Sequence, residues 1–292
     1  MTNESTLSIF ANFFINDEER FLRTKDSFLS FKDISAQKWV INVRGKYKLD
    51  VLFFLHDHLG EKLSAHVLES KKGWFHDSRS LIKEIDTDFV LFWIEDHINM
   101  VDVKKYDEIL DEMKQYKVDV LPYSWFSRRK LDIKHKGINS QTVKNIGFFL
   151  YDATLHSVIE KNIEGGSYII GCASIFSMSL FKKIINKNDP VFKRWPKKTP
   201  FDFEKGPKDT HWLPFVQGNP KYELFASIDD DVHAYKNEGL CLQTRGLYPK
   251  RVIRNKEMEM RKRPDKIVLK IYKAIIPLSM RVFIKRIKYT VF

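Results

Sequence analysis

The sequence predicts an α/β protein with a mostly parallel central sheet flanked by helices. Short apolar runs typical of strands alternate along most of the chain with segments of helical periodicity. The run at residues 88–94 is almost wholly apolar, as in a parallel strand covered on both faces, and it ends abruptly in charged residues. The chain of 292 residues is 43% hydrophobic, which is enough to bury a sizeable core.

The elements are expected in a regular order from the N-terminus. An apolar strand is followed by a turn of polar residues that starts a helix, then by a second strand and by an element at residues 51–55 whose type stays open. Further predictions are a short helix at 81–85, the strand at 88–94, a helix at 103–116, strands at 118–122 and 167–176, and a helix through Leu180 to Ile185.

Composition excludes several classes of protein. The cysteines, Cys172 and Cys241, lack the spacing of a disulfide framework or of a zinc site. The first residues lack a basic segment and soon meet the acidic residues 17–19, so they do not indicate a signal peptide, and no apolar stretch is long enough to span a membrane. We therefore expect a cytoplasmic protein, soluble or peripheral on the inner face of the cell membrane.

The net charge of +12 is concentrated at the C-terminus. From Lys250 onward there are fourteen Lys and Arg residues against three acids, which leaves 36 basic and 35 acidic residues before it. Residues 267–289 mix bulky apolar side chains with lysine and arginine at near-helical spacing. This pattern favours a tail, residues 250–292, that docks on an anionic membrane surface, over nucleic-acid binding. The alternative is a terminal helix packed on the body.

The strand at 88–94 ends in Glu95, Asp96 and His97, where a site is expected in an open α/β sheet. Carboxylates and an imidazole can hold a divalent ion such as Mn²⁺ or Mg²⁺, which stabilises a diphosphate leaving group. The alternative is a solvated turn.

From residue 1 to about residue 100 the order of elements, the turn from Asn16 to Glu19 and the segment 86–97 resemble family 2 glycosyltransferases and their GT-A relatives. The resemblance continues more loosely to about residue 215. It implies a GT-A domain at 1–249, with a nucleotide-sugar half at 1–100 and an acceptor half at 101–249. The donor-binding residues that it implies are Asn16, Glu18, Arg44, Lys72, Gly73, Arg79 and Glu95.

Two positions depart from the family pattern. Ile94 stands where the family has its first aspartate, so metal binding would fall to Asp96, Glu95 and His97, with His233 as a later ligand. Arg44 follows the second strand where the family usually has acidic residues that hold the nucleoside. The alternatives for Arg44 are a contact with a phosphate and a plain surface position.

The general base implied by the resemblance is a carboxylate about thirty residues after the segment 171–176. Glu204, Asp202 and Asp209 are the candidates, in that order, because aromatic neighbours can raise the pKa of a carboxylate. Their alternative role is pairing with nearby lysines. The cluster at 229–231 either binds acceptor hydroxyls or pairs with basic residues.

The function predicted from these observations is transfer of a sugar from a nucleoside-diphosphate sugar to a lipid-linked or glycan acceptor. The resembled family implies inversion of configuration, and the tail favours a role in cell-surface polysaccharide biosynthesis. The alternatives are a catalytically inactive GT-A-like membrane-associated scaffold and a nucleotidyltransferase, although a glycine-rich triphosphate loop is missing from the N-terminal turn.

Overall fold

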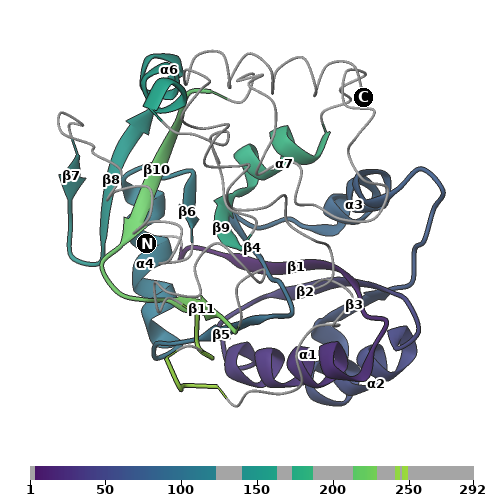
Figure 1. Ribbon diagram of the computed structural model, residues 1–292. Helices are drawn as coiled ribbons and strands as arrows, with labels where there is room; N and C mark the ends of the chain where they lie inside the picture. The colour runs from purple at the N-terminus through teal and green to yellow at the C-terminus, as the bar shows by residue number, and fades with distance from the viewer. Residues whose placement is uncertain are drawn as a thin grey trace, which may run out of the picture.

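The computed structural model describes residues 4–122, 140–162, 173–186, 213–228, 241–243 and 245–248. In this part of the chain a large sheet lies between helices (Figure 1). The strands are β1 Leu7–Phe14, β2 Lys38–Arg44, β3 Leu63–His66, β4 Phe89–Phe92, β5 His97–Asn99, β6 Val120–Pro122, β7 Gln141–Thr142, β8 Ile146–Tyr151, β9 Ser174–Ser177, β10 Phe215–Pro220 and β11 Phe225–Ser227. The helices are α1 Glu18–Phe31, α2 Lys48–Leu59, α3 Trp74–Leu81, α4 Lys104–Gln115, α6 Ala153–Asn162 and α7 Met178–Asn186, with short 3-10 turns at Gly60–Lys62 and Ile82–Glu84.

The main sheet has nine strands in the order β3-β2-β1-β4-β9-β6-β10-β8-β7, and β5 with β11 forms a second, two-stranded sheet. The four strands β3, β2, β1 and β4 run parallel to one another. β9 is antiparallel to both β4 and β6, so β6 runs in the same direction as β1. β10 is parallel to β6, and β7 also runs in this direction because both β7 and β10 are antiparallel to β8. Among the described strands of this sheet, β8 and β9 run in the opposite direction. The predicted fold class, a mostly parallel central sheet flanked by helices, is confirmed.

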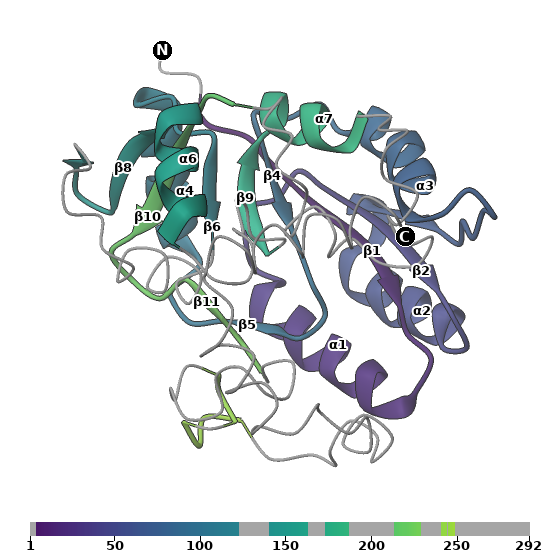
Figure 2. The same cartoon turned by 45° about the horizontal axis from the view of Figure 1, so that its top comes forward.

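The two faces of the sheet bury separate apolar clusters. Side chains of α1, α2 and α4 pack on one face, where alternate residues of β1 such as Ile9 and Phe13 point. Side chains of α3 and α7 pack on the other face, around Phe10, Trp74 and Phe181. Figures 1 and 2 show α1 and α2 on one side of β1 to β3, with α3 and α7 on the opposite side. The period of two along β1 therefore divides its side chains between two helical layers.

Most of the predicted elements are present with small shifts of their ends. The element of open type at 51–55 is the helix α2, and the short helix predicted at 81–85 is the end of α3 with its 3-10 turn. In the region predicted as a strand at 167–176, the described strand is β9, and residues 163–172 lie outside the description. The strands β3, β5, β7, β8, β10 and β11 and the helix α6 were not predicted.

No helix within the described residues is long and apolar enough to cross a membrane. The basic tail at 250–292 falls outside the described part of the chain, so its predicted helix and its docking role stay predictions. Tyr248, next to the tail, donates a hydrogen bond from its hydroxyl to a carboxylate oxygen of Asp26 in α1. The last described residues are thereby fixed to the N-terminal half of the protein.

Candidate functional site

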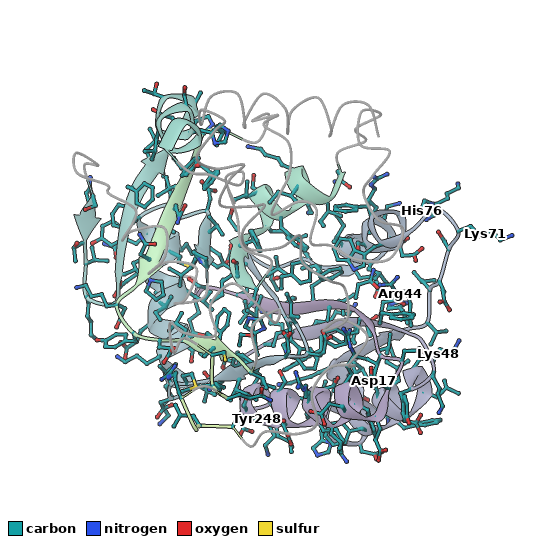
Figure 3. All side chains as sticks on the ribbon, viewed as in Figure 1. Asp17, Arg44, Lys48, Lys71, His76 and Tyr248 are labelled. Atoms are coloured by element: carbon teal, nitrogen blue, oxygen red, sulfur yellow. The ribbon has the colours of Figure 1, made fainter. Side chains whose placement is uncertain are left out.

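The carboxyl ends of β1, β2 and β4 lie beside one another at one edge of the main sheet. Asn12 of β1 is in register with Asn42 of β2, and Phe14 with Arg44. In open α/β sheets, ligands bind outside the carboxyl ends of the strands. Figure 3 shows Arg44 on the same side of the molecule as Lys71 and His76. This carboxyl-end edge is the candidate functional site.

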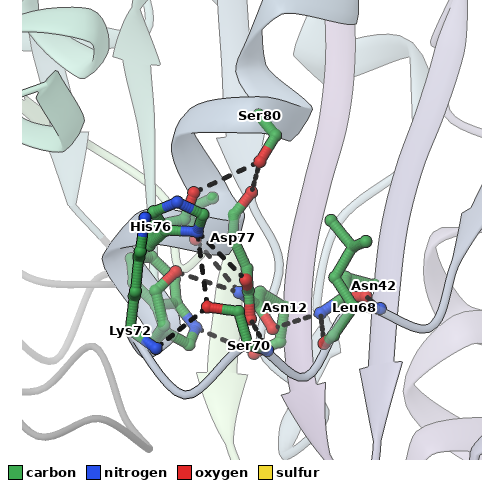
Figure 4. Close-up of polar contacts among 10 residues, drawn as sticks. Asn12, Asn42, Leu68, Ser70, Lys72, His76, Asp77 and Ser80 are labelled. Atoms are coloured by element: carbon green, nitrogen blue, oxygen red, sulfur yellow. Dashed lines mark hydrogen bonds and ion pairs between the residues drawn. The ribbon is translucent and has the colours of Figure 1, made fainter.

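A buried pair of asparagines fixes the loop that follows β3. The side-chain amide of Asn42 donates to Oδ1 of Asn12 at 2.9 Å and to the carbonyl of Leu68 at 3.0 Å, while Leu68 N–H donates to Oδ1 of Asn42 at 2.6 Å (Figure 4). Asn12 in turn donates to Oγ of Ser78 at 3.0 Å, and the indole N–H of Trp74 donates to the carbonyl of Asn12 at 3.0 Å. Two strands, the loop and α3 are thus held by one hydrogen-bond network.

The start of α3 is a tight turn organised by Ser70 and Asp77. The amide of Lys72 donates to Oγ of Ser70 at 3.1 Å, and the amide of Ser70 donates to Oδ2 of Asp77 at 3.1 Å (Figure 4). Gly73 precedes the helix with φ of 98°, a conformation that residues with a side chain rarely adopt. The glycine predicted as part of the site is therefore needed for the shape of this turn.

Arg44 lies at the end of β2 with only 4% of its surface exposed. Burial lowers the pKa of its guanidinium, and the carboxylates of Asp77 and Glu69 act in the opposite direction. The guanidinium also lies 5.9 Å from the centre of the ring of Phe14, which is 37% exposed. Of the two roles left open by the sequence, the plain surface position is wrong because the residue is buried.

The turn after β4 is tied to α1 by Arg20. One nitrogen of this guanidinium, Nη1, lies 3.2 Å from Oε1 of Glu95 and also donates to the carbonyl of Phe14 at 3.3 Å. Asp17 caps α1 by accepting from the amide of Arg20 at 2.9 Å. Since Glu95 is neutralised by a cation from α1, its carboxylate holds the turn in place.

Asp96 and His97 form the second half of the acidic turn. Oδ1 of Asp96 lies 2.8 Å from Nδ1 of His97, and the carbonyl of Asp96 accepts from the amide of Ile228 at 2.7 Å. Both side chains are largely buried, at 17% and 9% exposure. Within the described residues, no group of three or more His, Cys, Asp or Glu side chains is arranged to hold a metal ion.

The donor residues predicted from the resemblance divide into two groups. Asn16, Arg44, Lys72, Gly73 and Glu95 all belong to the carboxyl-end edge, where Oδ1 of Asn16 accepts from the amide of Lys46 at 3.3 Å. Glu18 is exposed in the first turn of α1.

Arg79 points elsewhere in the fold. Its Nε donates to the carbonyl of Ile185 at 3.0 Å, which joins α3 to α7, and burial lowers the pKa of the side chain. This hydrogen bond of Arg79 therefore joins α3 to α7.

The predicted general bases Glu204, Asp202 and Asp209 and the predicted ligand His233 lie outside the described residues. The same holds for the acidic cluster at 229–231. Their roles stay predictions.

Four residues of the edge were missed by the sequence analysis: Asn12, Phe14, Arg20 and Asn42. Asn12 and Asn42 could have been noticed, because each is a polar amide inside an otherwise apolar strand. Phe14 and Arg20 carry no such signal, since their importance depends on contacts with Arg44 and Glu95 in distant parts of the sequence.

No family model and no curated protein matches this chain. Among solved structures, S. aureus TarS residues 1–349 is 14% identical, with 61% of this chain and 48% of that chain covered and a TM-score of 0.37. The mannosyltransferase PcManGT from Pyrobaculum calidifontis, in complex with GDP-Man and Mn²⁺, is 9% identical, with coverages of 63% and 47% and a TM-score of 0.40. HddC from Yersinia pseudotuberculosis is 12% identical, with coverages of 77% and 93% and a TM-score of 0.38.

The chain spans about half the length of the TarS fragment and of the mannosyltransferase. Its own sheet order and strand directions, rather than these distant likenesses, define it as an α/β protein of the predicted class.

Proposed function

We propose that this chain is a glycosyltransferase that binds a nucleoside-diphosphate sugar at the carboxyl-end edge of β1, β2 and β4. The observation that carries the proposal is the combination of opposite charges at this edge. A buried guanidinium, Arg44, lies at the end of β2, and an acidic turn with Asp96 follows β4. A nucleotide sugar has an anionic diphosphate between its nucleoside and its sugar. A site for it needs a cationic group that contacts the phosphates and an acidic group that holds a divalent cation beside them.

The residues around Arg44 suit the nucleotide half of such a donor. Phe14 offers an exposed aromatic surface on which a base can stack, and the guanidinium of Arg44 next to it can only donate hydrogen bonds. Lys71 and Lys72 lie in the exposed loop that the asparagine pair fixes. These side chains would bind the base and the phosphates without any change in the sheet.

Asp96 is the residue that would hold a divalent cation. Its neighbour His97 already contacts one carboxylate oxygen, and Glu95 is engaged by Arg20, so the described residues offer few protein ligands. This fits an ion such as Mg²⁺ or Mn²⁺ that takes most of its remaining ligands from substrate phosphates and water. When bound, such an ion supplies charge stabilisation to the departing diphosphate.

The acceptor side of the proposal rests on the sequence alone. We propose a lipid-linked or glycan acceptor whose hydroxyl is deprotonated by Glu204, or by Asp202 or Asp209, in an inverting displacement. The basic tail at 250–292 would keep the enzyme peripheral on the inner face of the cell membrane, in cell-surface polysaccharide biosynthesis.

The test is a thermal-shift screen of the purified chain against UDP, GDP, CMP and dTDP, each with and without Mn²⁺ or Mg²⁺. UDP and GDP belong in the panel because TarS and the Pyrobaculum mannosyltransferase hold UDP and GDP-Man. We expect one nucleotide to raise the melting temperature selectively, because a ligand that binds only the native state stabilises it.

The matched variants are Asp96→Asn and Asp50→Asn. Asp96→Asn should remove the metal-dependent part of the shift and lower donor turnover at least about tenfold. Asp50 is an exposed carboxylate in the first turn of α2 and is not part of the acidic turn after β4, so Asp50→Asn should behave as wild type. A wild type that is stabilised by no nucleotide would instead favour the scaffold alternative.

A further inference from the structure

Two carboxamide side chains in β10 are buried without hydrogen bonds. Gln217 is 1% exposed, and within the described residues neither its Oε1 nor its Nε2 has a hydrogen-bond partner. Asn219 is 9% exposed, and its Oδ1 has no partner in that part of the chain either. A buried amide that makes no hydrogen bond destabilises the folded protein, so packing alone does not explain these two residues.

The two amides lie on one face of the main sheet. Phe215, Gln217 and Asn219 alternate along β10, so their side chains point to the same face. Phe215 belongs to the apolar cluster of α3 and α7, which identifies this face. β10 therefore changes from an apolar ring to amides towards its end, as β1 changes from Phe10 to Asn12. The amide of Asn12 is hydrogen-bonded, whereas that of Gln217 is not.

Asn219 lies at the carboxyl end of β10, on the same edge of the sheet as the candidate site. β10 is parallel to β6 and therefore runs in the direction of β1 and β4. The chain then enters β11, where Ser227 pairs with His97, and the amide of Ile228 donates to the carbonyl of Asp96 at 2.7 Å. Figure 1 shows β10 leading to β11, which lies beside β5. A short connection thus joins the end of β10 to the acidic turn.

The neighbours of the two amides are uncharged. On β8, Phe149 is opposite Gln217 and Gly147 is opposite Asn219, while Val120 of β6 pairs with Gln217 on its other side. A phosphate would find no cation among these paired positions. A carboxamide both donates and accepts hydrogen bonds, as a hydroxyl group does. This part of the face therefore suits a neutral ligand that carries hydroxyl groups.

We propose that Gln217 and Asn219 form a subsite for the hydroxyl groups of an uncharged sugar in the acceptor. The inference rests on the proposed glycosyl transfer and specifies its acceptor. β9 and β6 lie between β4 and β10, so at about 4.8 Å per strand the amides are about 14 Å from the strand that leads to the acidic turn. Since this distance exceeds one sugar ring, the subsite holds a sugar other than the one that receives the new bond.

Burial makes such a subsite selective. A sugar that bonds to these buried amides is shielded from water, and an analogue that lacks the bonded hydroxyl leaves an amide unpaired. We therefore expect the acceptor glycan to bind at least about tenfold more tightly than this deoxy analogue. A buried water is the simplest other partner for the amides, and it would give no such selectivity.

The test compares Gln217→Met with wild type. Methionine keeps the length of the side chain and removes both amide atoms, so the melting temperature should stay the same or rise. Saturation-transfer NMR titrations with chitobiose, lactose and mannobiose, with and without the nucleotide found in the thermal-shift screen, measure sugar binding. The variant should bind the disaccharide that wild type recognises at least about tenfold more weakly, and it should no longer distinguish the deoxy analogue.

The matched control is Asn145→Leu at the start of β8. Asn145 is also fully buried, but its side-chain amide donates to Oε1 of Glu112 at 2.6 Å. Removing a bonded amide should lower the melting temperature, while the folded variant should bind the disaccharide as wild type does. The two substitutions therefore have opposite expected effects on stability and on sugar binding.

Three results would overturn the proposal. Wild-type sugar affinity in Gln217→Met would leave a buried water as the partner of the amides. A melting temperature more than about 4 °C lower in this variant would give Gln217 a structural role. Binding of none of the disaccharides by wild type would contradict a glycan subsite.

The nucleotide-induced thermal shift separates this proposal from the proposed function. A wild type without any shift would count against the donor site at Arg44 and Asp96. A shift that persists in Gln217→Met, together with weaker sugar binding, would locate the defect in the acceptor subsite.

Discussion

Neighbouring residues of β1 show how differently the two faces of the sheet are built. Phe13 points towards α1 and α2 and packs against Trp93, with ring centres 4.8 Å apart. Asn12 belongs to the buried network with Asn42 and α3 instead. The residues of β1 that point to the α1 face are apolar along the whole strand. Those that point to the α3 face change from the apolar Phe10 to the polar Asn12 near the end of the strand.

The two faces therefore differ in role: the α1 face mainly stabilises the fold, and the α3 face mainly positions a loop at the candidate site. Apolar contacts on the α1 face need no specific partner beyond good packing, so they stabilise the fold without chemistry. On the α3 face, the buried amides of Asn12 and Asn42 are hydrogen-bonded, and the bonds of Asn42 to Leu68 fix a loop that leads to the candidate site. The face on which buried amides replace apolar side chains near the strand ends is therefore the face that leads to the candidate site.

The largest effect on stability is expected on the apolar face. Phe13→Ala should lower the free energy of unfolding by about 3–5 kcal/mol, because it removes a buried ring and leaves a cavity beside Trp93. Urea unfolding followed by tryptophan fluorescence measures this. If the loss were below about 1 kcal/mol, the α1 face would not be the main source of stability.

An intermediate effect is expected on the polar face. Asn42→Leu should cost about 1–3 kcal/mol, because the backbone groups of Leu68 and Oδ1 of Asn12 lose their partner. It should also weaken nucleotide binding, since the loop with Lys71 and Lys72 is released. Calorimetric titration with the nucleotide found in the screen measures the second effect.

The control for this variant is Ser8→Ala on the same face of β1. Oγ of Ser8 is buried and has no hydrogen-bond partner among the described residues. The substitution should change neither the free energy of unfolding nor the nucleotide affinity. An equal loss of affinity in both variants would show that any change in this face disturbs the site.

The smallest effect is expected for the ion pair between α1 and the acidic turn. Arg20→Met should cost no more than about 1 kcal/mol of stability, because the side chain of Arg20 is 34% exposed. The reversed pair Arg20→Glu/Glu95→Arg should recover part of this loss of stability, measured by urea unfolding. A reversed pair that is no better than Arg20→Met would mean that Glu95 has a role besides pairing.

Much of the fold and part of the site could be predicted from local patterns. The apolar runs at 7–15 and 88–94 predicted the strands β1 and β4, which span Leu7–Phe14 and Phe89–Phe92, and the acidic residues after 94 predicted a turn at the site. The type of α2 stayed open because Val51 to Leu55 are apolar without a break, so periodicity did not separate a helix from a strand. The strand β10 was not predicted because Gln217 to Pro220 lack the apolar pattern of a strand, and its pairing with β8 and β6 places it in the sheet.

The sequence by itself determined the α/β class, the glycine turn before α3 and the concentration of positive charge after Lys250, since each depends on residues close together in the chain. Only the tertiary structure decided that Arg44 is buried, that Arg20 neutralises Glu95 and that Asn42 holds Leu68. Arg20 and Glu95 are 75 positions apart in the sequence, and Asn42 and Leu68 are 26 apart. The burial of Arg44 depends on what covers the end of β2. The pairing of distant strands and the packing of the helices bring such groups together, whereas a pattern of neighbouring residues does not say which distant side chains will meet.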